Sequence, residues 1–327
     1  MSPSIRPATP SDLAGIVTLL IEDAQARAVQ DPRLWRLAPD ASERVERSVS
    51  NSLGGAGAFC LVAEDARRIV GVAQAMIVPV PPIYDDSAGA PGLLTDDCFV
   101  SADALPGTAD SLLAATEDVL RKAGAARLIG SCPAAGPLRP LYQRHGYEPV
   151  TLYMAKHGFR ADSVPPGARS ARDEDVSAIV RLSARHRKTL AELNARFWHI
   201  HAQADARFDR WMRISLTLTD RDMLVAGPPG HVRGYVIAQP CPPLLVPAAH
   251  DAKAVGVIDD FYDEDFGNTA VASNGGSGAD LLGAAESAFA RRSIDSALVV
   301  CPAAWPSKIA LLERNGFRTA KLWMLKR

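Results

Sequence analysis

Glycines that come directly before a helical pattern could bind an anion in this chain. The segment Gly275-Gly276-Ser277-Gly278 precedes apolar residues at positions 281, 282, 285 and 289, which have helical spacing. A helix that begins on glycines presents unpaired backbone N–H groups and the positive end of its dipole. The residues that could hold a pyrophosphate in this way are Gly276, Ser277, Gly278 and Ala279. A flexible surface loop is the alternative for the glycines alone.

A similar segment lies earlier in the chain. Leu105-Pro106-Gly107-Thr108-Ala109 also precedes an apolar helical pattern, so Gly107, Thr108 and Ala109 could have the same role. This is a weaker anion site, because Pro106 has no N–H to donate.

Two adjacent aspartates, Asp259 and Asp260, follow the apolar run Val255-Gly-Val-Ile258. A carboxylate at the end of a strand can accept a proton from an ammonium group, directly or through water. Neighbours on a strand point to opposite faces, so we expect only one of the two to face a given cleft, and the sequence leaves open which one. Paired aspartates at a strand end are also common in turns and helix caps.

The segments that must position these residues occur twice. The matched pairs are Arg6 to Leu19 with Arg169 to Leu182, Trp35 with Trp198, Asp96-Asp97 with Asp259-Asp260, Cys132-Pro-Ala-Ala with Cys301-Pro-Ala-Ala, and Gly146-Tyr147 with Gly316-Phe317. The separation is 163 residues in the early matches and 169 to 170 in the last two. This period indicates a duplicated domain, because solenoid repeats are only about 20 to 50 residues long.

Each copy is predicted to contain the same order of elements. A short strand leads into a helix whose apolar positions have 3.6-residue spacing, followed by a second helix and a β-hairpin. A strand then reaches the paired aspartates, and a glycine loop, a helix, a strand ending at Cys-Pro-Ala-Ala, a short helix and a last strand follow. The predicted fold class is α/β (α+β), with a mixed sheet flanked by helices in each copy.

The length of 327 residues suits two domains that each bury a core. We expect the domains to comprise residues 1–157 and 168–327, joined by a linker at 158–167. Pro165, Pro166 and Gly167 interrupt the apolar periodicity there.

The overall charge argues against polyanionic partners. The chain has 36 basic and 37 acidic residues, so we expect neither nucleic acid nor a membrane surface as a partner. The N-terminus lacks the apolar core of a signal peptide, and no run reaches the roughly 18 apolar residues of a membrane span. The five cysteines include no CxxC pair and lie mostly in apolar runs, which is typical of reduced core thiols in the cytoplasm.

Each copy resembles a GNAT-superfamily N-acyltransferase, and the resemblance covers essentially the whole chain. It rests on the order of elements, the paired aspartates, and two short motifs. The loop motif, with Gly at its fourth and Gly or Ala at its sixth position, is matched at 104–109 and 273–278, and the terminal block is matched at 141–147 and 311–317. The resemblance implies two tandem GNAT-like domains, each a mixed, mostly antiparallel twisted sheet flanked by helices.

Both copies depart from the family pattern. Ala104 and Ser273 stand where the family has a basic or amide residue at the start of the loop. The family tyrosine is kept as Tyr142, but the second copy has Leu312 in its place. One copy is therefore expected to be catalytic and the other degenerate.

The activity that the resemblance implies is direct transfer of an acyl group from acyl-CoA, with acetyl-CoA as the expected co-substrate, to a primary amine. No metal and no covalent enzyme intermediate are implied. The backbone of 276–279 is expected to hold the cofactor, and that of 107–109 more weakly. Asp259 or Asp260 would take the proton of the amine. Tyr142 could protonate the departing thiolate, since a phenol has a pKa near 10; the alternative is an ordinary half-buried aromatic.

The loop chemistry predicts the better cofactor site in the second copy, whereas Tyr142 argues for the first. The acceptor is expected to be a small-molecule or peptide amine, and the protein a monomer or homodimer. A non-catalytic acyl-CoA-binding or scaffold protein with two eroded sites is the alternative, because Pro106 weakens one copy and Leu312 the other.

Two further groups of residues suggest other sites. His186, His199 and His201 lack a Cys or carboxylate at ligand spacing, so no metal site is expected. Trp35 and Trp198 fall in the segment that lines the acceptor pocket in the resembling family. They could shape the choice of substrate or simply anchor the core.

Overall fold

The computed structural model describes residues 3–161, 165–267 and 276–327. The elements of the first copy are β1 (Ser4–Pro7), α1 (Leu13–Gln30), α2 (Ala41–Gly54), β2 (Ala58–Asp65), β3 (Arg68–Ile77), β4 (Pro91–Val100), α3 (Thr108–Lys122), β5 (Arg127–Pro133), α4 (Leu138–Arg144) and β6 (Tyr147–His157). Those of the second are β7 (Ala168–Ser170), α5 (Val176–Leu193), α6 (Ala204–Ser215), β8 (Asp222–Ala226), β9 (Gly234–Pro240), β10 (Val255–Asp263), α8 (Gly276–Arg291), β11 (Ser296–Pro302), α9 (Pro306–Arg314) and β12 (Arg318–Lys326). The predicted order of elements is therefore present twice.

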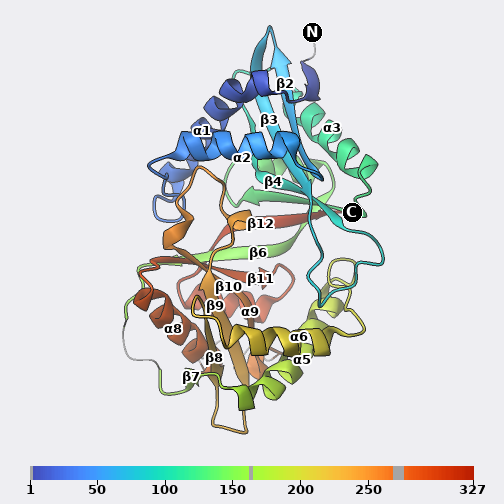
Figure 1. Cartoon of the computed structure of the whole chain (residues 1–327). Coiled ribbons are helices and arrows are strands. Elements are labelled where there is room, and N and C mark those ends of the chain that lie inside the picture. The colour runs from blue at the N-terminus through green and yellow to red at the C-terminus, as the bar shows by residue number, and fades with distance from the viewer. Residues whose placement is uncertain (1–2, 162–164, 268–275) are drawn as a thin grey trace.

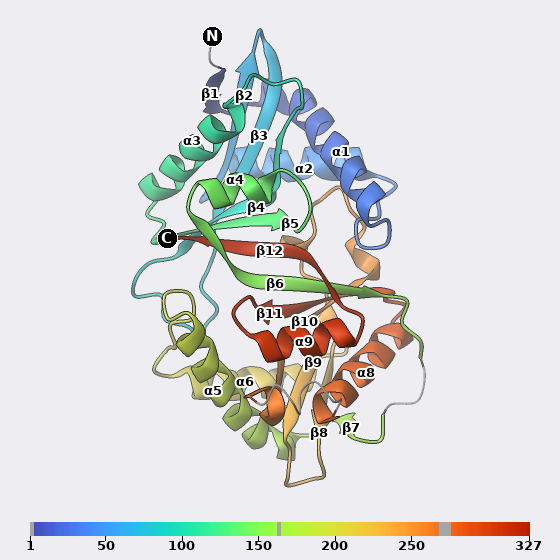
Figure 2. The same cartoon turned by 180° about the vertical axis from the view of Figure 1, so that it is seen from behind.

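All these strands join one sheet, in the order β1-β2-β3-β4-β5-β12-β6-β11-β10-β9-β8-β7. Two neighbouring pairs, β4 with β5 and β10 with β11, are parallel, and the other neighbours are antiparallel. In the first copy α1 and α2 cover one face of the sheet, and α3 and α4 cover the other (Figures 1 and 2). The mixed, mostly antiparallel sheet flanked by helices confirms the predicted fold class.

The two copies exchange their last strands. Strand β12 of the second copy lies between β5 and β6, and β6 of the first copy lies between β12 and β11. Leu322 thus pairs with Cys132, and Leu152 pairs with Cys301. The expected domain 1–157 therefore ends in a strand that is built into the sheet of the other copy. Within the expected linker, residues 162–164 lie outside the described residues.

Two equivalent ion pairs attach the exchanged strands to helices. Lys326 on β12 binds Glu117 on α3, and Lys156 on β6 binds Glu286 on α8 with an Nζ–Oε1 distance of 2.6 Å. Each lysine thus binds a helix of the copy to which it does not belong. The shared core agrees with this arrangement, because Ile129 of the first copy lies in the same buried cluster as the second-copy residues. The copies are therefore built as one structural unit.

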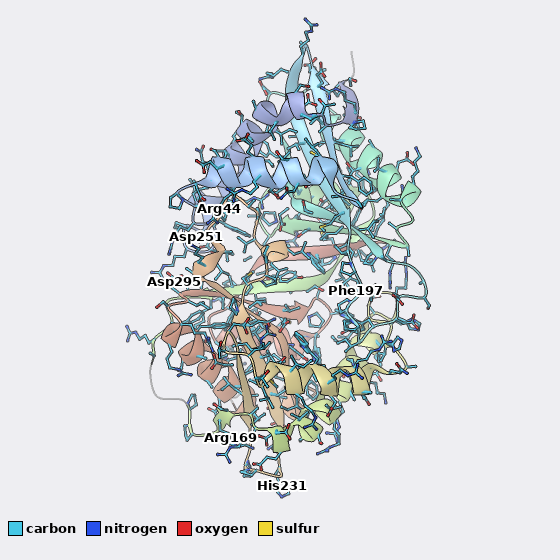
Figure 3. The ribbon with its side chains drawn as sticks, viewed as in Figure 1. Arg44, Arg169, Phe197, His231, Asp251 and Asp295 are labelled. Carbon is cyan, nitrogen blue, oxygen red and sulfur yellow. The ribbon has the colours of Figure 1, made fainter. Side chains whose placement is uncertain are left out.

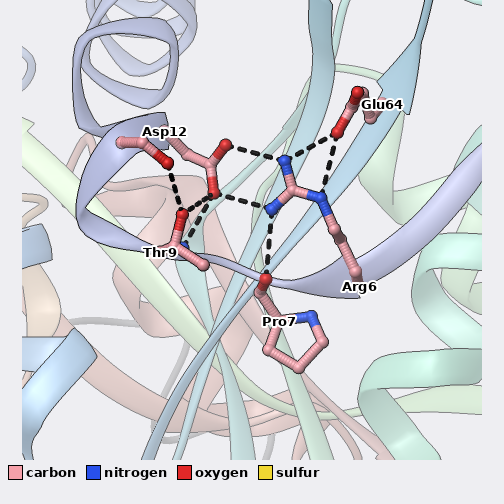
Figure 4. Close-up of polar contacts among 6 residues, drawn as sticks. Arg6, Pro7, Thr9, Asp12 and Glu64 are labelled. Carbon is pink, nitrogen blue, oxygen red and sulfur yellow. Dashed lines mark hydrogen bonds and ion pairs between the residues drawn. The ribbon is translucent and has the colours of Figure 1, made fainter. Parts of the chain in front are cut away.

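A second repeated ion pair fixes the entry into the first helix of each copy. Arg6 donates to both carboxylate oxygens of Asp12, at 2.7 and 2.8 Å, and also to Glu64 (Figure 4). Arg169 binds Asp175 in the same way, with both distances at 2.7 Å. These contacts explain why an Arg and an Asp six residues apart occur at the same place in both copies.

In the described part of the chain, no helix combines the length and apolarity needed to cross a membrane.

Candidate active sites in the two copies

In each copy, two parallel strands of the sheet stop pairing and separate at the equivalent position. Strand β4 pairs with β5 only over Pro91–Leu94, and β10 pairs with β11 only over Val255–Ile258. The paired aspartates follow within two residues of each opening. Both copies therefore have a point where two parallel strands separate next to carboxylates.

A β-bulge orients the aspartates of the second copy. Along β9, Ala238 pairs with Ile258 and the next residue, Ile237, pairs with Asp260, so Asp259 is the extra residue. A bulge places two residues opposite one and re-aims their side chains. Both Asp259 and Asp260 consequently line one cavity, which differs from the expectation that only one would face a given cleft.

The first copy contains a cavity of about 430 Å³ at the opening between β4 and β5. Asp23 and Arg27 of α1 line it, as do Ala109 of α3 and Tyr142 of α4. Since α1 and the pair α3 and α4 cover opposite faces of the sheet (Figures 1 and 2), the cavity passes through the gap between the strands. Its lining therefore comes from both faces of the sheet.

Tyr142 is placed at the centre of this cavity. It is only 1% exposed, and its hydroxyl has no hydrogen-bond partner within residues 3–161, 165–267 and 276–327. Gly130 on β5 makes room for the ring, since an added Cβ there would lie 2.8 Å from it. Burial raises the pKa of Tyr142 well above its usual value of 10, so the phenol stays protonated and has a proton to donate.

A carboxylate of α1 faces the same cavity. Asp23 pairs with Arg27 at 2.5 Å, and burial raises the pKa of Asp23 despite that pairing. The raised pKa makes Asp23 a better proton acceptor than an ordinary aspartate. Sequence analysis did not single out either residue, because both lie within an amphipathic helix.

One of the two first-copy aspartates at the opening, Asp96, already has partners. Asp96 is buried and binds the Lys321 ammonium group of β12, and it accepts a hydrogen bond of 2.9 Å from Ser131. Burial raises the pKa of the neighbouring Asp97 to about 6. Lys321 also donates to the Leu245 carbonyl at 3.0 Å. The second-copy segment that contains Leu245 therefore lies beside the strand opening of the first copy.

The start of α3 lies at the rim of the first cavity. Gly107 is the helix N-cap with a φ of +84°, and the Thr108 hydroxyl donates to the Leu105 carbonyl at 2.6 Å. Of the three predicted cofactor residues here, Ala109 lines the cavity. Arg144 of α4 lines it too and lies 3.4 Å from Asp110. A helix N-terminus and a guanidinium group are thus available to phosphates.

In the second copy, side chains fill the corresponding gap. Lys308 on α9 is 1% exposed, and its Nζ donates 2.8 Å to the carbonyl of Phe261, just beyond the point where β10 leaves β11. The ring centroids of Phe261, Phe266 and Trp305 lie 5.4 to 5.7 Å from Lys308 Nζ. The Phe261 carbonyl beside the gap therefore already has a hydrogen-bond donor.

The predicted cofactor residues of the second copy lie at the start of α8. Gly276 has a φ of +68°, and Ser277 donates 2.6 Å to the Asp263 carboxylate. Gly278 packs against the side chains of Leu311 and Phe266, and Ala279 follows on the same turn. Ser273, Asn274 and Gly275 of the predicted loop lie outside the described residues. A carboxylate thus lies beside this helix start, as Asp110 does in the first turn of α3, so the two helix starts alone do not distinguish the copies as cofactor sites.

A second cavity, of about 600 Å³, lies above the bulge of the second copy. Gln239 donates 2.7 Å to Asp259, and Tyr235 donates 2.7 Å to Asp260, whose carboxylate is also 3.1 Å from His186 Nδ1. The Asp259 side chain is exposed to the cavity. Partial desolvation by the surrounding protein, with the charge of Asp260, raises the pKa of Asp259 to about 7.

The two equivalent tryptophans have different surroundings. Trp198 lines the second cavity, whereas Trp35 packs against His250 in the core with a ring separation of 5.3 Å. His199 and His201 lie on the segment that follows Trp198. Among the residues that the structure describes, no group of three metal-ligating side chains comes together.

Solved structures with the same fold are acetyltransferases. A GCN5-related N-acetyltransferase from Sphaerobacter thermophilus is 17% identical, with a TM-score of 0.57, and the match covers 99% of this chain and 94% of that one. A GCN5-related glucosamine N-acetyltransferase region of a fungal multi-domain GH3 β-N-acetylglucosaminidase is 13% identical, with a TM-score of 0.56, over 99% of this chain and 38% of that chain.

A tandem GNAT protein from the clavulanic acid biosynthesis pathway is 15% identical, with a TM-score of 0.49, over 99% of this chain and 97% of the other. The fold assignment rests on the two higher scores. No protein-family model and no curated protein matches the chain. The duplicated order of elements and these likenesses show that the chain has the fold of the GCN5-related N-acetyltransferases, built from two GNAT-like copies.

Proposed function

We propose that the protein is an acyl-CoA-dependent N-acyltransferase that transfers an acetyl group from acetyl-CoA directly to a primary amine. The cavity of the first copy carries this proposal. It passes through the sheet where β4 and β5 separate, and it is lined by Tyr142, whose buried hydroxyl has no hydrogen-bond partner among the described residues. A buried polar group without a partner is costly unless a ligand completes it.

The residues of the first copy have distinct roles in this proposal. The N–H groups at Gly107, Thr108 and Ala109, together with Arg144, bind the phosphates of the cofactor. The pantetheine arm lies in the gap between the strands. Asp23 accepts one proton of the ammonium group, and the resulting amine nitrogen attacks the thioester carbonyl. The C–N bond forms, the C–S bond breaks, and Tyr142 protonates the departing thiolate. The nitrogen then loses its second proton, which restores the Tyr142 phenol through water, and the proton on Asp23 passes to solvent.

Asp259 and Asp260 receive no role in transfer here. Proton acceptance by these carboxylates would serve acyl transfer only if a thioester lay beside them. Lys308 and Trp305 fill the gap through which its pantetheine arm would reach. The second copy is therefore the degenerate one with respect to the cofactor.

One observation favours a second candidate function, that of an acyl-CoA-binding protein without transfer. In the first copy, the Lys321 ammonium group already binds a carboxylate at the strand opening, and the segment around Leu245 packs beside it. An acceptor amine would have to enter along α1 instead, past Asp23. The acceptor could be a small molecule or a peptide.

An activity assay separates the two candidates. Purified protein is incubated with acetyl-CoA and a panel of primary amines, and acetylated amine is measured by mass spectrometry. We expect Tyr142→Phe to lower kcat by about 100-fold, the usual contribution of a general acid, and to leave acetyl-CoA binding unchanged. Binding of acetyl-CoA without any product from wild type would favour the second candidate, and absence of binding would refute both.

A further inference from the structure

The larger cavity has walls from both copies. The first-copy segment 78–84 reaches across to the second copy (Figure 1) and lines the cavity. It is held by hydrogen bonds from the Asp85 amide to the His199 carbonyl at 2.7 Å and from Arg207 to the Pro82 carbonyl at 2.9 Å. Phe197, labelled in Figure 3, comes from the chain that meets this segment. The duplication therefore builds an enclosure that one copy would not form alone.

Aromatic rings make up much of the lining. They include those of Tyr84, Phe197, Trp198, Phe208, Trp211 and Trp323. Such rings favour an apolar ligand body, and their faces attract a cation. The cavity of about 600 Å³ lies within the range of small-molecule sites.

The guanidinium groups at the lining have partners already. Arg187 pairs with Asp205 and Arg221 pairs with Asp220. The other two, Arg127 and Arg207, donate to the carbonyl oxygens of Arg196 and Pro82. Lys308 likewise donates to the Phe261 carbonyl.

Among the described residues, the hydrogen-bond partners of the two carboxylates are uncharged or titratable. Asp259 is bound by the amide of Gln239, and Asp260 by Tyr235 and His186. In addition, His186 Nε2 is buried and has no partner in the described part of the chain. The base of the cavity thus offers negative charge and a free polar atom to a ligand.

We propose that this cavity is a binding site for a hydrophobic primary amine, which it holds at Asp259 and Asp260 without acylating it. The ammonium group binds the paired carboxylates, and the apolar body of the ligand lies against the aromatic rings. The amine is not acylated, because Lys308 and Trp305 close the gap through which a thioester would approach. This site is separate from the one assigned to acyl transfer.

Three ligands with the same apolar body test the proposal. They are 4-phenylbutylamine, 4-phenylbutan-1-ol and 4-phenylbutyrate, each titrated calorimetrically into the full-length protein without acyl-CoA. We expect the amine to bind at least tenfold more tightly than the alcohol, and the carboxylate more weakly than both. Equal affinities would overturn the proposal, as would tightest binding of the carboxylate.

Variants locate the site. Asp259→Asn should lower the preference for the amine over the alcohol and leave alcohol binding unchanged, because one of the two carboxylates that bind the ammonium group is lost and Asp260 remains. This variant is suitable because Asp259 faces the cavity and its amide replacement keeps the shape. Leu244→Trp places a large ring at a partly exposed lining position and should weaken all three ligands. Retention of the full amine preference in Asp259→Asn would refute the assignment.

A variant of the other copy distinguishes this proposal from the proposed function. Ala135→Trp is designed to block the first cavity, where Ala135 is an exposed lining residue, and it should leave amine binding intact. Acetylation of 4-phenylbutylamine by Ala135→Trp would show that the second copy transfers acyl groups and would contradict a non-acylating site. If wild type bound the amine but transferred nothing to any amine, the binding site would stand and the proposed function would fall.

Discussion

Replacing Lys321 with methionine tests whether the exchanged strand is locked into the first copy. The Lys321 side chain is fully buried, and its ammonium group binds Asp96, which is 4% exposed, and the Leu245 carbonyl. Lys321→Met leaves a buried carboxylate without its cation. Removing one partner of such a buried pair costs about 3–5 kcal/mol.

The cost should be visible in thermal unfolding. An unfolding entropy of about 2.1 cal/mol/K per residue means that each kcal/mol lowers the Tm of a chain of 327 residues by roughly 1.5 °C, so we expect a fall of at least about 4 °C, measured by circular dichroism. The control is Lys156→Met. Lys156 forms an ion pair with Glu286, and the two side chains are 27% and 18% exposed. A partly exposed pair contributes only about 1 kcal/mol or less.

A double variant separates the lost pair from lost packing. Lys321→Met combined with Asp96→Leu removes both buried charges, so it should recover part of the stability that Lys321→Met loses. The reasoning would be refuted if Lys321→Met destabilised the protein no more than Lys156→Met does. It would also be refuted if the double variant were less stable than Lys321→Met alone, because that result would mean that each substitution adds its own buried defect.

The remaining predictions concern pH and the glycines. Arg169 holds the pKa of Asp175 below its usual range, so Arg169→Met should cost about 1–2 kcal/mol at pH 7. In urea unfolding that difference should begin to shrink as pH falls below about 4, where the unfolded carboxylate becomes protonated, and should vanish only once pH has fallen through the lower pKa of the folded state. The preference of the second cavity for an amine should rise as pH increases through 7, since the Asp259 carboxyl has a pKa of about 7 and is charged only above it; titrations at pH 6 and 8 check this. Gly107→Pro should weaken acetyl-CoA binding and Gly276→Pro should not, although both replace a glycine with positive φ; calorimetry of the two variants decides.

The order of elements could be predicted because it depends on local sequence patterns. Apolar spacing, glycine loops and the repeated Arg6 to Leu19 segment identify helices, strands and the duplication without knowledge of contacts. The exchange of β6 and β12 could not be predicted in this way. Both strands have similar apolar patterns, so either could pair with β5 or with β11, and only long-range packing decides.

The site was harder to predict for the same reason. A single bulge at Asp259 turns both carboxylates into one cavity, and strand alternation alone predicts the opposite. The sequence does indicate that the gap between β10 and β11 is filled by side chains. Trp305 and Lys308 stand where the first copy has Gly136 and Arg139, and a comparison of the copies for side-chain size would have identified the narrower gap.

The most direct test of the account is calorimetric titration of acetyl-CoA into wild type, Ala135→Trp and Ala304→Trp. The two alanines are equivalent and exposed, each three residues beyond the shared cysteine of its copy, so the substitutions are matched. The account predicts that wild type and Ala304→Trp bind with the same affinity and that Ala135→Trp loses binding. Loss of binding in Ala304→Trp alone would place the cofactor in the second copy and contradict the central claim.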